Sequence, residues 1–348
     1  MRPTALVTGA AGFMGSHIVD SLIRDMNVVG MDDLSGGFIE NVNSRSTFVH
    51  GSITDHRLIE KLFEKYKFDY VYHLAAYAAE NLSHFIRRYN YDNNLMGSVN
   101  LINASVNHNV KCFVFTSSIA VYGEPKKLPV TEDMTAAPED CYGVAKYAVE
   151  LDLQAAHKMF NLDYIIFRPH NVYGERQNIA DKYRNVIGIF INCILQSLPI
   201  PIFGDGEQTR AFSHIDDVAP AIAQSVNHPE AFNRVFNVGG DQYYSVNQVA
   251  EIVCKTMGIN SAISYLPERN EVKHIYSSQE KIKQILGITA DVDLETGIER
   301  MVNWARKHGA RKTKDFTGIE IERNLPESWR SVPKANEFSE WPKISAVK

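Results

Sequence analysis

The chain has 348 residues, of which 45% are hydrophobic and 22% are charged, and these values are ordinary for a soluble globular protein. This length suits two closely joined domains or one large α/β domain with a cap. The formal net charge of −5 argues against a surface that binds nucleic acid or an anionic membrane. An anionic substrate would therefore need a local basic pocket.

The four cysteines have neither CxxC nor metal-ligand spacing: Cys112, Cys141, Cys193 and Cys254. We expect them to be reduced, buried thiols, and we expect no metal site. The chain begins directly with a strand-like run at residues 4–7, without a signal-peptide pattern. It also lacks the run of about 18 apolar residues that a membrane-spanning helix needs. These features predict a cytoplasmic protein with no membrane partner.

The first 180 residues alternate short apolar runs with helical patterns. Strands are expected at residues 5–8, 28–31, 47–50, 70–74, 112–116 and 164–168. Helices are expected between them at residues 15–24, 57–66, 91–108 and 142–160. This alternation predicts an α/β fold with a doubly wound parallel sheet, covered by helices on both faces, over residues 1–180.

The pattern changes after about residue 175, where prolines and glycines at 199–206 precede helical patterns at 246–257, 278–286 and 294–307. We predict a smaller cap over residues 181–310. Residues 236–245 are expected to return to the first domain, because residues 236–238 are typical of a strand. Residues 311–348 form a charged tail, for which Trp329 and Trp341 suggest docking on the body, with disorder as the alternative.

A glycine-rich turn ends the first predicted strand. Gly9, Gly12 and Gly15 let the backbone turn tightly, approach a pyrophosphate and direct the N–H groups of the next helix toward it. Asp32 ends the second strand, where a carboxylate can accept hydrogen bonds from both ribose hydroxyls and repel a 2′-phosphate. The pattern predicts a Rossmann site that prefers NAD to NADP. Asp33 is the alternative ribose ligand, with Asp32 then capping the following turn.

A second pattern concerns proton transfer. Tyr142 and Lys146 lie four residues apart on a predicted helix, so they share one face. A free phenol with a pKa of about 10 is a poor base, and lowering that pKa by about three units takes about 4 kcal/mol of phenolate stabilisation. We expect the Lys146 ammonium and the nicotinamide charge to supply it, while Ser118 orients a substrate hydroxyl and shares its proton. The alternatives are a solvated helix face and a serine that caps a turn.

Taken together, these motifs resemble those of the extended short-chain dehydrogenase/reductases over residues 3–305. The resemblance also includes residues 73–76, 94–97, 116–123, 168–174 and 203–206. It implies that Ser118, Tyr142 and Lys146 are catalytic and that NAD lies across the carboxyl edge of the sheet. The implied cofactor contacts are Gly9, Gly12, Phe13, Met14, Gly15, Asp32, Asp33, Ser52, Ile53, Leu74, Ala75, Ala76, Asn94, Tyr142, Lys146 and a backbone contact of His170. Ser52 departs from the aspartate that is more usual at the adenine position.

The neighbours of Ser118 discriminate between the reactions of this family. The resembled 4,6-dehydratases carry an Asp-Glu pair directly after the catalytic hydroxyl, because elimination of water needs an acid and a base. The sugar-acid decarboxylases carry a glutamate at the second of these positions. Here the two residues are Ile119 and Ala120. What remains resembles the UDP-glucose 4-epimerases, in which C4 is oxidised, the bound ketose turns over, and the hydride returns to the other face.

The resemblance also implies a site for a UDP-sugar. Arg210 and Arg269 match arginines that clamp the diphosphate, and such forked hydrogen bonds suit that group. Two surface arginines are the alternative. The remaining substrate-binding positions implied are Ser118, Asn171, Asn185, Phe203 beside the uracil, and Gln208. Tyr276 matches a position where a bulky side chain narrows the sugar pocket, and a packing tyrosine is its equal alternative.

Several alternatives stay open. The enzyme can act on another UDP-sugar, such as a uronate or an N-acetylhexosamine, or reduce a keto-sugar. An inactive NAD-binding sensor or scaffold is the non-enzymatic alternative. We also expect a homodimer, because residues 94–108 and 147–160 resemble helices that pair as a four-helix interface. The apolar residues that can serve the core and the partner alike are Leu95, Val99, Ile102, Val149 and Leu153.

Overall fold

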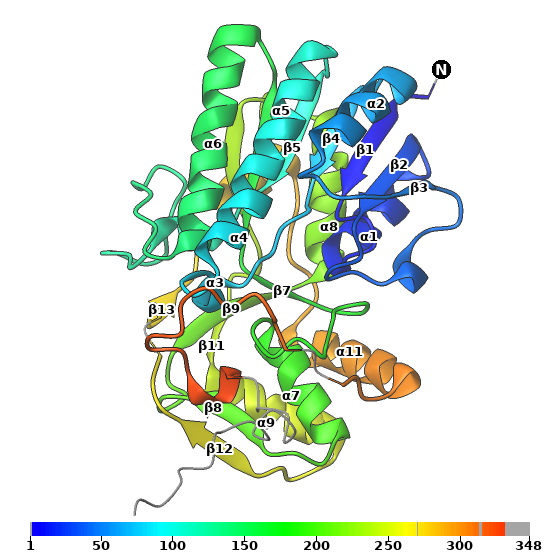
Figure 1. The fold of residues 1–348 in the computed structure, drawn as a ribbon. Coiled ribbons are helices and arrows are strands. Elements are labelled where there is room, and N and C mark those ends of the chain that lie inside the picture. Colours follow the sequence, from blue (N-terminus) through cyan, green and yellow to red (C-terminus); the bar gives the residue numbers. More distant parts are fainter. Residues whose placement is uncertain (1, 270, 313–314, 331–348) are drawn as a thin grey trace, which may run out of the picture.

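The structure, a computed structural model, describes residues 2–269, 271–312 and 315–330 (Figure 1). Its centre is a seven-stranded sheet in which every neighbouring pair is parallel. The strands, in their order across the sheet, are β10 (Arg234–Val238), β6 (Tyr164–Pro169), β5 (Cys112–Thr116), β4 (Tyr70–His73), β1 (Thr4–Thr8), β2 (Asn27–Asp32) and β3 (Thr47–His50). The predicted doubly wound α/β fold is confirmed.

Helices cover both faces of this sheet because its strands are apolar on both sides. On one face α2 (His56–Tyr66), α5 (Gly97–Asn107) and α6 (Cys141–Phe160) contribute residues to one buried core. On the other face α1 (Phe13–Leu22), α8 (Ile215–Gln224) and α10 (Glu280–Leu286) contribute to a second core. The helix predicted at 91–108 is divided in the structure into α4 (Arg87–Tyr91), a π-helical turn at Asp92–Met96 and α5. The short α3 (Glu80–Ser83) precedes it, directly after the loop that follows β4.

A smaller layer lies beyond the carboxyl ends of the strands (Figure 1). Its strands are β7 (Asn171–Tyr173), β8 (Ile200–Phe203), β9 (Thr209–His214), β11 (Tyr243–Ser245), β12 (Ile263–Leu266) and β13 (His274–Ile275). Strand β9 lies between β11 and β13 and also pairs with β7, while β8 pairs with β12. The helices α7 (Val186–Leu195), α9 (Val246–Met257) and α11 (Leu294–His308) bury a third core around Phe190, Val253 and Met301.

The predicted domain limits stay a prediction, but the packing bears on them. Strand β10, which includes the strand expected at 236–238, pairs with β6 at the edge of the main sheet. Helices α8 and α10 also pack in a core of that sheet, although both fall inside the range 181–310. The chain therefore passes from one layer to the other more than once. Among the described residues, no helix is long and apolar enough to cross a membrane.

A buried ion pair joins α6 to the sheet. The Arg168 guanidinium on β6 donates from Nε to Glu150 Oε1 at 3.0 Å and from Nη2 to Oε2 at 2.5 Å. Ser117 Oγ, just after β5, donates to the same carboxylate at 2.5 Å. Glu150 is fully buried and Arg168 is 5% exposed, so each charge depends on the other for solvation. The pair fixes α6 relative to β5 and β6.

Replacing Arg168 with methionine should leave the Glu150 carboxylate buried without its ion-pair partner. We expect Arg168→Met to lower the free energy of unfolding by about 3–5 kcal/mol. The double variant Arg168→Met/Glu150→Leu should recover much of that loss, since it leaves no unpaired charge. Urea denaturation of the three proteins measures both effects. A single variant within about 1 kcal/mol of wild type would contradict the assignment.

Candidate active site

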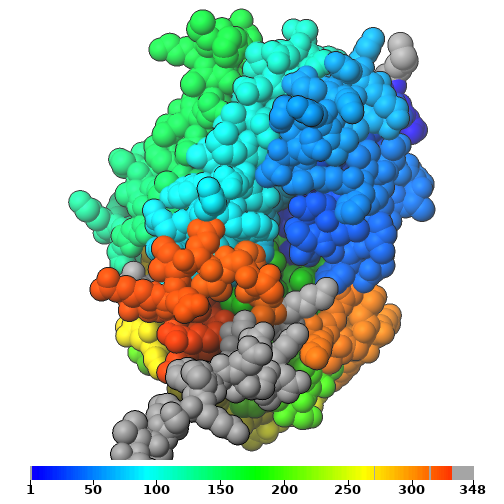
Figure 2. Space-filling view, viewed as in Figure 1, coloured from blue at the N-terminus to red at the C-terminus, as the bar shows by residue number. Residues whose placement is uncertain are grey.

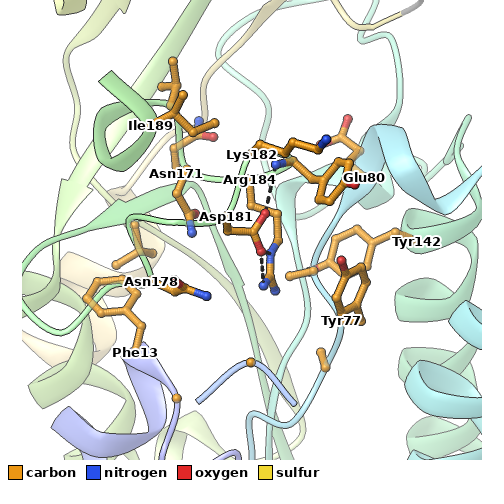
Figure 3. Close-up of a pocket in the computed structure, with 18 of the residues that line it drawn as sticks. Phe13, Tyr77, Glu80, Tyr142, Asn171, Asn178, Asp181, Lys182, Arg184 and Ile189 are labelled. Atoms are coloured by element: carbon orange, nitrogen blue, oxygen red, sulfur yellow. Dashed lines mark hydrogen bonds and ion pairs between the residues drawn. The ribbon is translucent and has the colours of Figure 1, made fainter. Parts of the chain in front are cut away.

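A cavity of about 800 Å³ lies between the carboxyl edge of the main sheet and the smaller layer (Figure 3). Parallel strands present their carboxyl ends on the same edge, so residues far apart in sequence meet there. The loops after β1, β2, β4 and β5, the first turns of α6 and several segments of the smaller layer line it. It contains most of the site residues that the sequence predicts.

The glycine turn has the close backbone packing that its sequence implies. Gly12 N donates to Gly9 O at 3.0 Å, and Gly9 has a φ of +73°, a conformation that favours glycine. A Cβ on Gly15 would lie 2.0 Å from Gly9 O, and one on Gly9 would lie 2.9 Å from Ala75 N. The turn therefore excludes side chains and leaves bare backbone at the start of α1.

Asp32 stabilises this turn from the neighbouring strand. Its carboxylate accepts hydrogen bonds from Ala11 N at 3.0 Å and from Leu34 N at 2.7 Å. Burial raises the pKa of Asp32, and these two backbone bonds act in the opposite direction. Asp33 is exposed and accepts a hydrogen bond from Ser35 N at 2.9 Å. Both side chains line the cavity, but only Asp32 is buried against the turn.

Tyr142 and Lys146 lie in the first two turns of α6, where the caps of the helix place them. Asp140 caps the helix by accepting from Gly143 N at 2.8 Å, and Ser83 Oγ accepts from Tyr142 N at 3.1 Å. Lys146 Nζ donates to Thr116 O, at the end of β5, at 2.8 Å and lies 5.8 Å from the centre of the Tyr142 ring. Both side chains reach the cavity from one helix face, as their spacing predicts.

Ser118 completes this group from the end of β5. Its hydroxyl accepts from Ala120 N at 3.1 Å and so caps the short 3₁₀ helix Ile119–Tyr122. It also lines the cavity, and its interaction with the Tyr142 hydroxyl lowers the pKa of that phenol in part. Ser118 can therefore cap the 3₁₀ helix and lie beside Tyr142 at the same time, although we expected one role or the other from the sequence.

The electrostatics of the three residues differ from the expectation. Burial raises the pKa of Tyr142 well above its ordinary value and outweighs the contribution of Ser118. Burial also lowers the pKa of Lys146 to about 7, with Glu150 acting in the opposite direction. Burial therefore opposes phenolate formation at Tyr142 and the protonated form of Lys146, and positive charge that binds beside Tyr142 would act in the opposite direction on its phenol.

Nearly all the other predicted site residues also line the cavity. On the cofactor side these are Gly9, Gly12, Phe13, Met14, Gly15, Ser52, Ile53, Leu74, Ala75, Ala76 and His170. On the substrate side they are Asn171, Asn185, Phe203, Gln208, Arg210 and Arg269. Burial lowers the pKa of His170 to about 4 and its ring pairs with the Ser277 hydroxyl, which favours a neutral ring over a proton shuttle.

Two predicted residues do not line the cavity. The buried Asn94 side chain accepts from Tyr77 N at 2.8 Å and donates to Tyr77 O at 3.1 Å, so it holds the loop after β4. The Tyr276 ring instead stacks on Tyr243, with the ring centres 4.5 Å apart. The packing alternative therefore describes Tyr276 in this structure better than a gate on the sugar pocket.

The arginines at the far end are partly buried, with side chains that are 16% exposed for Arg210 and 20% exposed for Arg269. Arg210 donates to the carbonyl oxygens of Thr209 and Lys273, each at 2.9 Å, and to that of Val272 at 2.5 Å. Arg269 lies 3.8 Å above the centre of the Phe203 ring, and burial lowers its pKa. Glu271 Oε2 lies 4.0 Å from Arg210 Nη2 and 3.3 Å from Arg269 Nη2, so this carboxylate offsets part of the positive charge at this end of the cavity.

Sequence reasoning missed several charged residues in the cavity. Arg184 Nε donates to Asp181 Oδ2 at 2.7 Å, and its guanidinium lies 4.8 Å from the centre of the Tyr77 ring (Figure 3). Glu80, at the start of α3, lies in the same cavity as Tyr142 (Figure 3). Neither belongs to a spaced motif, so no local sequence signal marks them. For the tail that carries Trp329, docking on the body and disorder were the two alternatives. In the structure Trp329 also lines the cavity.

Residues 5–239 match the sequence model of the NAD dependent epimerase/dehydratase family. The chain belongs to this family. It is 37% identical over 306 residues to a putative UDP-glucose 4-epimerase of Methanocaldococcus jannaschii, a match that covers 87% of this chain and 98% of that protein.

Solved structures agree with this membership. The fold is similar to that of a UDP-glucose 4-epimerase of Thermotoga maritima with UDP-glucose, at a TM-score of 0.83 and 35% identity over 88% of this chain and 99% of the other. It is also similar to a UDP-glucuronic acid 4-epimerase of Bacillus cereus in complex with UDP-glucuronic acid and NAD. That match has a TM-score of 0.81 and 29% identity over 88% and 99% of the chains.

NAD is the cofactor of this epimerase/dehydratase family member, and the residues of the cavity fit it. The bare glycine turn leaves room for a pyrophosphate at the N-terminus of α1. The buried Asp32 carboxylate closes the same end, where a ribose is expected. The roles of individual residues in holding NAD stay predictions.

Asp32 should make the protein prefer NAD to NADP, because a carboxylate beside the ribose repels a 2′-phosphate. We expect wild type to bind NAD at least about 10-fold more tightly than NADP, and Asp32→Ala to lose that preference. Asp33→Ala is the matched control and should keep it. Calorimetric titration of cofactor-free protein measures the ratio. Equal affinity of wild type for both cofactors would sink the assignment, and loss of preference only in Asp33→Ala would transfer it to Asp33.

Proposed function

We propose that the protein is an isomerase that epimerises C4 of a nucleotide sugar with NAD, and that UDP-glucose and UDP-galactose are its substrate pair. One observation carries the proposal: Ser118, Tyr142 and Lys146 line one cavity, while Ile119 occupies the wall where a dehydratase needs an acid. Ala120 is buried and apolar as well. The site therefore has one acid-base group for a hydroxyl and lacks the pair that elimination of water requires.

In this proposal Tyr142 and Ser118 act on the C4 hydroxyl, and Lys146 acts on Tyr142. Tyr142 accepts the proton of that hydroxyl, and the Ser118 hydroxyl holds the same oxygen in place. Lys146, fixed by the Thr116 carbonyl, adds positive charge behind the phenol when it is protonated. NAD, when bound, supplies the hydride acceptor and later the hydride donor. When the 4-keto sugar is reduced from its other face, Tyr142 returns the proton.

The far end of the cavity suits the nucleoside diphosphate. Arg210 and Arg269 supply two guanidinium groups for the phosphate oxygens, and Phe203 supplies an aromatic face for the base. Anchored at this end, the sugar can turn over at the other without leaving the protein. A 4-epimerase needs this turnover of the bound sugar in addition to the oxidation of C4.

The choice of sugar follows the relatives. Several of them are named UDP-glucose 4-epimerases, which supports a neutral hexose over a uronate. Burial, with a contribution from the nearby Asp140, raises the pKa of the Glu80 carboxyl in the same cavity to about 7. An N-acetylhexosamine, keto-sugar reduction and a non-catalytic NAD sensor remain the alternatives.

The test of this function is a panel of UDP-, GDP- and dTDP-sugars incubated without added NAD, followed by product separation. We expect interconversion of UDP-glucose and UDP-galactose and little turnover of UDP-glucuronate. In deuterated water the product should carry no deuterium at C4. Deuterium at C4 or C5 would instead indicate exchange with solvent through an enol and contradict the mechanism. Turnover of no sugar at all would favour the sensor.

Tyr142→Phe is the matched variant for the same assay. It removes the phenolic oxygen and keeps the ring, so turnover should fall at least ~100-fold, the usual contribution of a positioned proton-transfer group. Bound NAD should be retained, because the glycine turn and Asp32 are unchanged. Full activity in this variant would defeat the catalytic assignment.

We also infer that the protein is a cytoplasmic homodimer, formed through α5 and α6. Ile102, Val149 and Leu153 are buried within one copy, so they serve its core and cannot form the interface. The large apolar side chains exposed on α6 include Val144 and Leu151, which lie seven residues apart and share one face. Light scattering at micromolar concentration should give a dimer, and Leu151→Glu should give a monomer. A monomeric wild type would refute the inference.

A further inference from the structure

Residues 315–330, here called the strap, lie beyond residue 305, where the resemblance to the family ends. In the match to the M. jannaschii relative, 87% of this chain accounts for 98% of the other protein. The chain therefore carries length that this relative lacks. The family reaction as proposed above does not use the strap.

The strap crosses the junction between the two layers of the molecule. In Figure 2 its orange-red surface runs between the cofactor-binding half and the smaller layer. In Figure 1 the same segment passes near α3 and returns to the smaller layer near β8. It ends with a 3₁₀ turn at Glu327–Trp329. The strap therefore covers one side of the region that contains the cavity.

Specific contacts anchor the strap to the cofactor-binding half. The Glu320 carboxylate accepts from Arg88 N at 2.8 Å and from Tyr89 N at 2.9 Å, at the start of α4. The backbone of the same residue makes a further hydrogen bond, in which Glu320 N donates to Phe85 O at 2.8 Å. Asp315 also accepts from Lys182 Nζ, a cavity-lining residue, at 2.5 Å. Side-chain and backbone bonds together define one path for the strap.

Trp329 brings the strap into the active-site cavity. Its side chain is only 3% exposed and lines the cavity. The Arg269 guanidinium lies 5.7 Å from the centre of its ring, and the Phe203 ring centre lies 6.4 Å away. Phe85 and Tyr183 meet the indole edge-on, with ring centres 6.2 Å and 5.2 Å away. The indole therefore stands beside the pair assigned to the base and the diphosphate.

We propose that the strap closes the nucleotide end of the active site and that Trp329 is a substrate-positioning residue on it. The inference rests on the proposed function, since it takes Phe203 and Arg269 as the nucleotide end. Trp329 gives Arg269 a second aromatic neighbour and adds an apolar wall at this end. A nucleoside diphosphate held there is then enclosed by the strap, while the dinucleotide end at the glycine turn lies away from it.

The role predicts a selective loss of binding. Trp329→Ala should raise the KM for the UDP-sugar about 10-fold, the scale of a lost aromatic contact together with its packing, and change kcat less than about 3-fold. Trp329→Phe should restore most of the affinity. NAD content should stay at the wild-type level in both variants. Trp304→Ala is the matched control, because Trp304 lies on α11, has its ring centre 4.6 Å from that of His308 and does not line the cavity.

A binding measurement gives an answer that does not depend on turnover. The chain has three tryptophans, so Trp304→Phe/Trp341→Phe leaves Trp329 as the sole indole. Titration of this variant with UDP should change its fluorescence in a saturable way, with the same midpoint as calorimetry. Titration with NAD should change it much less.

A KM within about two-fold of wild type in Trp329→Ala would overturn the proposal, and so would the lack of a fluorescence response to a UDP concentration that calorimetry shows to bind. Either result leaves the proposed function intact if UDP-glucose is still epimerised. The proposed function fails separately if wild type binds no UDP and turns over no UDP-sugar. Loss of NAD as well as UDP-sugar binding in Trp329→Ala would assign the strap to overall stability and also overturn the positioning role.

Discussion

The pairing of Glu150 with Arg168 is the interaction on which the geometry of the active site depends. Helix α6 carries Tyr142 and Lys146, while Ser118 and Thr116 belong to β5 and the turn after it. The carboxylate of Glu150 joins these elements, since it binds Arg168 on β6 and Ser117 beside Ser118. A small shift of α6 along the sheet would separate the phenol from the serine. An ion pair without solvent permits little such movement, because any displacement exposes a charge to an apolar interior.

The electrostatics of the cavity follow from the same burial. Low solvent access lowers the pKa of Lys146 to about 7 and raises that of Tyr142, which is the reverse of what proton abstraction needs. Burial thus favours the neutral form of both groups, whereas opposite charge brought beside either group by a ligand would favour its ionised form. Burial also raises the pKa of Glu80 to about 7. The cavity therefore combines basic residues with a carboxyl whose protonation can change when a charged ligand binds.

Much of this structure was predictable from sequence, for identifiable reasons. The alternation of buried strands and helices defines the doubly wound sheet, and the carboxyl ends of its strands bring the glycine turn, Asp32 and Ser118 to one edge. Helical periodicity alone places Tyr142 and Lys146 on a common face. These features depend on local backbone geometry, which a sequence pattern encodes directly.

What the sequence did not predict depends on tertiary contacts between loops. Spacing after Arg269 left a pocket role and a packing role equally open for Tyr276, whose ring stacks on Tyr243. Asn94 matches a cofactor-side position of the family. In the structure its side-chain amide makes hydrogen bonds with the backbone N–H and carbonyl of Tyr77. Arg184 enters the cavity because Asp181 and Tyr77 hold its guanidinium there. No period or motif in the chain encodes such pairings.

The position of the strap in the chain has a consequence for biosynthesis. The glycine turn lies far ahead of Trp329 in the chain, and Trp329 follows every strand and long helix of the described structure. Because domains generally fold from the N-terminus as they are made, the cofactor site can form while the strap is still being translated. A strap placed as proposed would therefore cover a site whose strands and glycine turn precede it in the order of synthesis.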